Sequence, residues 1–192
     1  MRTSPLALLL GVVVAVMTVS ACGDAEPATD FDPESSLIST LEISSAAFED
    51  GAAIPIEFTC DGQNSSPPLR WTDVPGGTRS IAIIVDDPDV PGGIFRHWSV
   101  FNIPSGTRSL AANQATTPKL KDSIRQGVND FGSTGYEGPC PPEGQEHEYV
   151  FFIYALSEPL NLEGNASAQD VSAALRGKVL GTGSFSGMYA RH

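Results

Sequence analysis

The sequence predicts one mostly-β domain, a β-sandwich with one or two short peripheral helices. Three observations support this fold class. The apolar segments are short, they are separated by loops that draw on 19 Gly and 15 Pro, and only one segment has a helical repeat. The chain has 192 residues, of which 41% are hydrophobic. This length suits a single domain with a sizeable core.

Several segments have the composition of strands. The run SIAIIVD (Ser80–Asp86) is almost continuously apolar, which predicts a strand buried on both faces. His97–Ile103 and Glu148–Leu156 are rich in aromatic and β-branched residues, and each follows a loop. Ala52–Phe58 alternates apolar and other residues, and Gly183–Tyr189 is a candidate for the last strand.

One segment, Ser167–Leu180, is predicted to be a helix. Ser167 is a favourable N-cap, and Asp170 lies near the positive end of the helix dipole. An apolar residue recurs every four positions, at Val171, Leu175 and Val179.

The N-terminus has the features of an export signal. Arg2 precedes a short apolar run, which ends at VSAC (Val19–Cys22). We interpret residues 1–21 as a lipoprotein signal peptide, Cys22 as the lipidated residue, 22–40 as a flexible acidic tether and 41–192 as the folded domain. The alternative is an ordinary signal peptide with a coincidental Cys. The preferred interpretation places the domain on the extracytoplasmic side of the cell membrane.

The net charge of −12 limits the partners of the domain. Nucleic acid is not expected to bind, because the 11 basic residues are scattered and phosphate backbones require clustered Lys and Arg. Removal of residues 1–21 takes away the charge of Arg2 and leaves −13. A lipid anchor, rather than surface charge, is therefore expected to hold the protein at the membrane.

Cys60 and Cys140 remain after Cys22 is assigned to the anchor. In an exported protein an even pair of cysteines favours a disulfide. The alternative is two free thiols, one of them nucleophilic.

Two loops carry residues that suit a binding site. The first, DPDVPGG, follows Ser80–Asp86 and holds Asp87 and Asp89, and His97 begins the next strand. Period-2 alternation predicts that His97 shares a face of this strand with Ser99, Phe101 and Ile103.

The second loop, within Gly132–Tyr149, also leads into a strand. There His147 and Tyr149 are expected on one side. Each candidate also has an ordinary structural explanation: Asp beside Pro often caps a turn, a His can lie at a rim, and a Tyr can belong to the core.

Three motifs together resemble the phosphatidylethanolamine-binding protein (PEBP) family, in its bacterial YbhB/YbcL, Raf kinase inhibitor-like subgroup. DGQNSSPPLRW (Asp61–Trp71) is similar to the loop before the first signature. The set DPDVP, HW and NIP, between Asp87 and Pro104, resembles the first signature. Phe131–Leu156 resembles the second, and the resemblance extends from Leu41 to Tyr189.

The resemblance implies a Greek-key β-sandwich with a small pocket that binds phosphate-type groups, including phospholipid head groups. The family's pocket positions fall on the following residues: Asp87, His97, Pro141, His147 and Tyr149, with Asp89 in the same loop. Tyr189 lies in a C-terminal segment that borders the pocket in the family. The two carboxylates would orient a His, accept an ammonium group or bond loop amides, since they would repel a dianion.

We therefore expect a lipid-anchored binding protein that is not an enzyme and uses no cofactor or metal. Three alternatives remain. Two carboxylates and two histidines are able to support acid–base catalysis, and the same side chains are possible zinc or manganese ligands. Family members are also described as inhibitors of kinases or serine proteases, so the domain is alternatively an inhibitor or interaction module for an envelope protease or another envelope protein.

Overall fold

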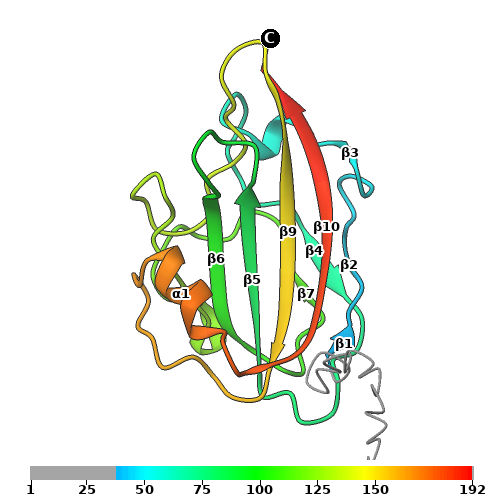
Figure 1. The fold of residues 1–192 in the computed structure, drawn as a ribbon, viewed down its shortest axis with the longest axis vertical. Coiled ribbons are helices and arrows are strands. Elements are labelled where there is room, and N and C mark those ends of the chain that lie inside the picture. The colour runs from blue at the N-terminus through cyan, green and yellow to red at the C-terminus, as the bar shows by residue number, and fades with distance from the viewer. Residues whose placement is uncertain (1–37, 192) are drawn as a thin grey trace, which may run out of the picture. The chain divides into compact units, whose positions relative to one another are not determined.

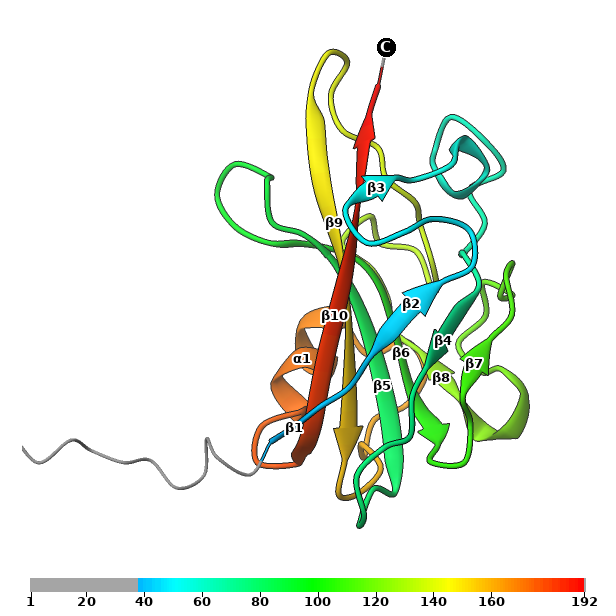
Figure 2. The same ribbon diagram turned by 90° about the vertical axis from the view of Figure 1, so that its right-hand side faces the viewer.

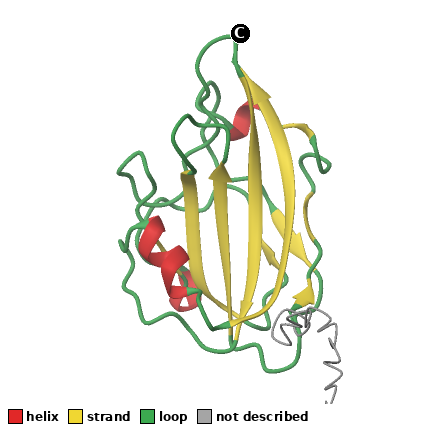
Figure 3. Ribbon diagram, viewed as in Figure 1, coloured by secondary structure: helices red, strands yellow, loops and turns green. Residues whose placement is uncertain are grey.

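The computed structural model describes residues 38–191, and strands dominate this part of the chain (Figures 1 and 3). The larger sheet contains β1 (Ser39–Thr40), β3 (Ala52–Ala53), β5 (Ser80–Asp87), β6 (Phe95–Pro104), β8 (Arg125–Gln126), β9 (Glu146–Leu156) and β10 (Val179–Ala190). The smaller sheet contains β2 (Ile43–Ser45), β4 (Leu69–Trp71) and β7 (Ser109–Leu110). The described helical segments are α1 (Ala168–Ala174) and 3₁₀ turns at Ile56–Phe58 and Lys121–Ser123.

The larger sheet has the order β1-β10-β9-β5-β6-β8, with β3 pairing the far end of β10. Its long strands are antiparallel, and β9 returns beside β5 only after the chain has passed through β6, β7 and β8. This long return is the Greek-key connection expected for the fold. The smaller sheet packs on one face of the larger one, and α1 lies against the other face (Figure 2).

β5 is buried on both faces, as its sequence predicts, and all eight of its residues are buried. Ile81, Ile83 and Val85 point into the core between the two sheets. Ala82 and Ile84 point into a second core, beneath α1. A strand in the middle of a three-layer structure therefore needs apolar side chains on both of its faces, at odd and at even positions.

β9 confirms the strand expected at Glu148–Leu156, but it begins two residues earlier, at Glu146. Its odd-numbered residues are buried and most of its even-numbered residues are partly exposed. This alternation places His147 and Tyr149 on the inner side together, as predicted.

The segment Ala52–Phe58 does not form the expected strand. Only Ala52 and Ala53 pair with β10, and Ile56–Phe58 form a 3₁₀ turn. Pro55 has no N–H to donate to a ladder, so pairing stops before it.

The helix is shorter than predicted. Ser167 caps it by accepting a hydrogen bond of 3.0 Å from the Asp170 N–H, but α1 ends at Ala174. Gly177 follows with a left-handed φ of 71°, and Val179 then begins β10. Val171 and Leu175 do pack into the core beneath α1. Within residues 38–191, no helix has the length and apolar character needed to cross a membrane.

The predicted common face of His97, Ser99, Phe101 and Ile103 is wrong. The pairing of β6 with β5 shifts register twice, between Val85 and Asp86 and between Ile81 and Ile83. Phe101 consequently lies beneath α1, whereas Ile103 lies between the sheets. β-bulges break the period-2 rule, and nothing in the local composition reveals them.

The predicted signal peptide, the predicted lipidation site Cys22 and most of the predicted tether lie outside the described residues. Ser39 and Thr40, which the sequence analysis assigned to the tether, pair as β1 with Gly181 and Thr182 of β10.

Candidate functional site

The candidate site lies at one end of the larger sheet, where three strands meet. β5 is antiparallel to both of its neighbours, so its last residues lie beside the first residues of β6 and β9. Asp87 pairs with Phe95, and Asp86 pairs with Val150. The topology thereby brings together two loop–strand junctions that are about 50 residues apart in the sequence.

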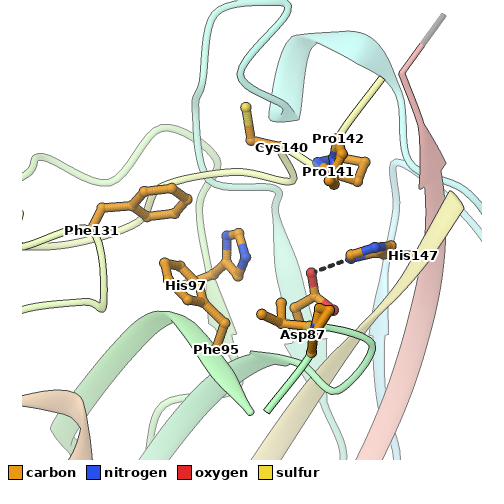
Figure 4. Close-up of a pocket in the computed structure, with 10 residues that line it drawn as sticks. Asp87, Phe95, His97, Phe131, Cys140, Pro141, Pro142 and His147 are labelled. Atoms are coloured by element: carbon orange, nitrogen blue, oxygen red, sulfur yellow. Dashed lines mark hydrogen bonds and ion pairs between the residues drawn. The ribbon is translucent and has the colours of Figure 1, made fainter. Parts of the chain in front are cut away.

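Asp87 and His147 form a buried pair at the base of the site (Figure 4). The His147 Nδ1 lies 2.8 Å from the Asp87 Oδ2, and both residues are at most 5% exposed. Because a carboxylate oxygen accepts hydrogen bonds, the proton of neutral His147 is on Nδ1. Asp87 therefore orients the ring and leaves its Nε2 directed away, 3.4 Å from the Gln145 Oε1.

Two further carboxylate oxygens of this loop accept hydrogen bonds from backbone amides. The Asp87 Oδ1 accepts from the Asp89 N–H at 2.9 Å. The Asp89 Oδ2 accepts from the Glu148 N–H at 2.8 Å, which ties the loop to β9. Of the roles considered from the sequence, these contacts match orientation of a histidine and bonding of loop amides.

His97 lies opposite this pair, with only 2% of its surface exposed. Its Nδ1 donates to the backbone carbonyl of Glu137 at 2.7 Å. The rings of Phe95, Phe131 and Tyr149 surround it edge-on, with centroids 5.1–5.3 Å away. Burial lowers the pKa of His97 below its ordinary value, although the Glu137 carbonyl and the charge of Asp87 partly oppose this effect.

Tyr149 packs against both histidines from β9. Its ring contacts His97 edge-on and stacks on His147, with centroids 5.1 and 6.5 Å away. Burial and the nearby Asp87 carboxylate raise the pKa of its hydroxyl. That hydroxyl is buried and makes no hydrogen bond of good geometry within the described residues.

These residues surround a cavity of about 210 Å³ (Figure 4). It is lined by Asp87, Val90, Pro91, Phe95, His97, Phe131, Cys140, Pro141, Pro142 and His147. Four predicted residues line it, namely Asp87, His97, Pro141 and His147. Asp89 and Tyr149 do not line it and instead support it from behind.

The apolar lining of the cavity was not predicted from the sequence. Val90 and Pro91 belong to the DPDVPGG loop, and Phe95 lies two residues before the predicted start of its strand. Phe131 is 44% exposed at the mouth of the cavity, and Phe95 packs against it with ring centroids 4.7 Å apart. Together these two rings give the cavity an apolar edge, and only the structure brings them side by side.

Cys60 and Cys140 are joined by a disulfide, with their Cα atoms 5.5 Å apart. Cys140 lines the cavity, so the structure removes the thiol–histidine pair with His147 that free cysteines would have offered. Tyr189 does not reach the cavity, because its hydroxyl donates to the Asp61 Oδ2 at 2.8 Å. Within residues 38–191, no group of three or more His, Cys, Asp or Glu side chains is placed to hold a metal ion.

Comparison with known proteins assigns the chain to one family. Residues 44–190 match the model of the phosphatidylethanolamine-binding protein family. The UPF0098 protein of Methanothermobacter thermautotrophicus is 46% identical over 151 residues, which cover 79% of this chain and 99% of that relative.

Two further proteins extend the comparison. LppC of Mycobacterium tuberculosis, whose name describes it as a lipoprotein, is 41% identical over 152 residues, or 77% of this chain and 73% of LppC. The crystal structure of Escherichia coli YbcL, described as a member of the mammalian PEBP family, superimposes with a TM-score of 0.74. It is 33% identical, and the alignment covers 80% of this chain and 100% of YbcL.

Proposed function

Because the chain belongs to the phosphatidylethanolamine-binding protein family, we propose that it binds a small phosphate-type anion in the His97 cavity, either free or as a phospholipid head group. The observation that carries this proposal is the pairing of two buried imidazoles, one of them oriented by Asp87, across a small cavity. Cavities that enclose drug-sized ligands usually measure about 300–1,000 Å³. A volume of about 210 Å³ suits a head group better than a whole metabolite.

The protonation of His97 controls which ligands fit. Its Nδ1 proton is already donated to the Glu137 carbonyl. The neutral ring therefore offers only a lone pair at Nε2, and it cannot donate to an oxygen of a dianion. Only the imidazolium, or a ligand that carries its own proton, makes the hydrogen bond.

Because the pKa of His97 is lowered, the affinity for an anion should depend on pH. A buried His97 is neutral near pH 7 and becomes charged as the pH falls below its lowered pKa. Among the residues that the structure describes, no Lys or Arg lines the cavity to supply a permanent positive charge. Affinity for phosphate should therefore increase as the pH falls.

Calorimetric titration of the full chain with inorganic phosphate and with phosphoethanolamine, between pH 5 and 8, tests this proposal. We expect tighter binding at pH 5 and loss of binding in His97→Ala. Ser109→Ala, an exposed change in the smaller sheet, is the control and should bind as the unaltered chain does. Affinity that does not vary with pH would contradict capture by histidine.

The source of the phosphate group needs a separate comparison. Phosphatidylethanolamine vesicles that compete with soluble phosphoethanolamine would identify a head group as the ligand. Phosphatidylcholine vesicles provide the matched lipid control. Competition by neither vesicle, with soluble phosphate still bound, would indicate a free anion.

We propose further that the protein is a lipid-anchored, extracytoplasmic protein with a binding rather than a catalytic role. The name of LppC and the VSAC sequence at Val19–Cys22 support the anchor. The Cys140 sulfur is bonded in a disulfide and is not a free nucleophile, which supports a binding rather than a catalytic role. Mass spectrometry of the mature N-terminus should find acyl groups on Cys22, and Cys22→Ala should release the protein from membranes.

A further inference from the structure

The wall of the cavity opposite Asp87 is formed by residues 136–142, which belong to no helix or strand. Pro139, Pro141 and Pro142 have no backbone N–H, so this segment cannot be held by a sheet ladder. It nevertheless supplies the Glu137 carbonyl that binds His97, as well as part of the cavity lining. Contacts from outside the segment must therefore fix its position.

On its inner side the segment is held by His97. The Glu137 N–H donates to the His97 carbonyl at 3.1 Å, and the His97 Nδ1 donates to the Glu137 carbonyl at 2.7 Å. The first contact is between backbones, while the second fixes which ring nitrogen of His97 carries a proton.

On its outer side the segment is held by residues 58–64, which we call the brace. The Gly138 N–H donates to the Asn64 Oδ1 at 2.7 Å. The Cys60 N–H donates to the Pro139 carbonyl at 3.1 Å. The disulfide between Cys60 and Cys140 adds a covalent link.

The brace and the wall lie in close contact. The Tyr136 hydroxyl donates to the Phe58 carbonyl at 2.8 Å. A Cβ added at Gly138 would lie 2.2 Å from that same carbonyl oxygen, so only glycine permits this approach.

The C-terminal strand secures the brace in turn. The Arg191 guanidinium contacts both carboxylate oxygens of Asp61 at 3.1–3.2 Å, and the Tyr189 hydroxyl donates to the same carboxylate. The Gly144 N–H donates to the Arg191 carbonyl at 2.9 Å. Arg191, which follows β10, therefore contacts both the brace and Gly144, two residues beyond the wall.

We propose that Asn64 and the Cys60–Cys140 disulfide are positioning elements of the anion site, so that ligand affinity depends on an intact disulfide. Neither Asn64 nor Cys60 lines the cavity, so neither is expected to contact the ligand. They hold the wall where the Glu137 carbonyl meets His97 and where Pro141 and Pro142 close the cavity. The inference rests on the proposed function where the measurement is ligand affinity, and a second measurement does not depend on that function.

The second readout is the ionisation of His97. Burial and the charges of Asp87 on β5 and Glu137 in the wall act on this ionisation, and Tyr149 and His147 of β9 lie beside the same cavity. The hydrogen bond to the Glu137 carbonyl raises the pKa of His97 against the effect of burial. A wall that has moved away should therefore shift the His97 titration to lower pH.

The experiment compares oxidised and reduced full-length protein, and Asn64→Ala with Asn64→Asp. In the reduced sample, dithiothreitol supplies two electrons and two protons to Cys60 and Cys140 and becomes a cyclic disulfide. We expect affinity for inorganic phosphate to fall by about tenfold or more on reduction and in Asn64→Ala. Asn64→Asp keeps the acceptor oxygen and tolerates the positive φ of 55°, so it should restore binding.

Gln63→Ala is the matched control, since Gln63 is exposed and neighbours Asn64 in the brace. NMR titration of the His97 ring, assigned with His97→Ala, should show a lower midpoint in reduced protein and in Asn64→Ala, with no change in Gln63→Ala. The dispersion of core resonances reports whether each sample remains folded. Asn64→Ala tests the inference even if reduction unfolds the chain, because its disulfide is intact.

The outcomes separate the two proposals. If oxidised protein binds no phosphate, the proposed function fails, while the His97 titration still tests positioning. If folded Asn64→Ala retains both the phosphate affinity and the His97 midpoint of the unaltered chain, the positioning role is overturned.

Discussion

The cavity has one half built on strands and another half built on loops, and different interactions hold them. Asp87, His97 and His147 lie on β5, β6 and β9, whose ladders and two apolar cores fix their backbones. Cys140, Pro141 and Pro142 lie on an irregular segment fixed by a disulfide and a few hydrogen bonds from the brace. The strand half is therefore stabilised mainly by burial of apolar side chains, and the loop half by a disulfide and hydrogen bonds to the brace.

Reducing the disulfide should give the largest effect on the loop half. The link joins residues separated by 80 positions, and the chain-entropy model gives such a loop about 4–5 kcal/mol of stabilisation. Urea unfolding followed by Trp fluorescence, with and without dithiothreitol, measures the difference. A loss below about 1 kcal/mol would show that the brace and wall are held together without the link.

Phe151→Ala should give the next largest effect, on the strand half. Phe151 is fully buried and packs against Phe185 and Phe48, with ring centroids 4.8 and 5.9 Å away. Removing such a ring costs about 3–4 kcal/mol through lost burial and a cavity. The adjacent Phe152→Ala, on the partly exposed face of β9, is the control and should cost clearly less in the same urea experiment. Equal losses would contradict the inward and outward alternation of β9.

Asp86→Asn tests the strand half alone, because the adjacent residues Asp86 and Asp87 have different partners. Asp87 has a His147 partner at 2.8 Å, whereas the Asp86 Oδ1 is buried without a hydrogen bond and 3.8 Å from the Arg96 Nε. Burial raises the pKa of Asp86 to about 6. Since the unfolded carboxyl ionises near pH 3.8, ionised Asp86 opposes folding above pH 6, and this penalty disappears as the pH falls toward 4.

Asp86→Asn should therefore stabilise the protein by about 1–2 kcal/mol at pH 7.5 and have little effect at pH 4. Unfolding free energies of both proteins across this range provide the measurement. A variant that is destabilised at pH 7.5 would mean that the Arg96 interaction outweighs the cost of burial.

Tyr149→Phe should have the smallest effect. The hydroxyl is buried without a partner, so its removal should change stability by no more than about 1 kcal/mol, in the stabilising direction. Tyr149 does not line the cavity, and phosphate affinity should remain within about twofold. A larger loss of affinity in calorimetry would show that the hydroxyl reaches the ligand, as the family resemblance implies.

The strand half was the more predictable one. The apolar run Ser80–Asp86 and the alternation of Glu148–Leu156 are local patterns that burial imposes, and both strands are present. The ends of elements were less predictable. Val179 continues the apolar repeat of α1, yet it pairs with Leu156 in β10, because sheet pairing depends on a partner that is distant in sequence.

The candidate site was predicted in part from the sequence. The resemblance to family motifs indicated Asp87, His97, Pro141 and His147, which do line one cavity. It did not single out Phe131 as a lining residue, and it left several roles open for Asp89, of which the structure shows a hydrogen bond to the Glu148 amide. Side-chain direction at a bulge or in a loop depends on contacts with other segments, which composition does not encode.

A mostly-β domain, the family and the residue types available to the site could all be inferred from the sequence, because burial patterns and motifs are local. The fold was needed to show that Asp87 orients His147, that His97 donates its Nδ1 proton to Glu137, and that a disulfide links the wall to the brace. These relations join residues 40 to 80 positions apart. Their hydrogen bonds require atomic distances near 3 Å, which only the packing of the sheets and the brace can set.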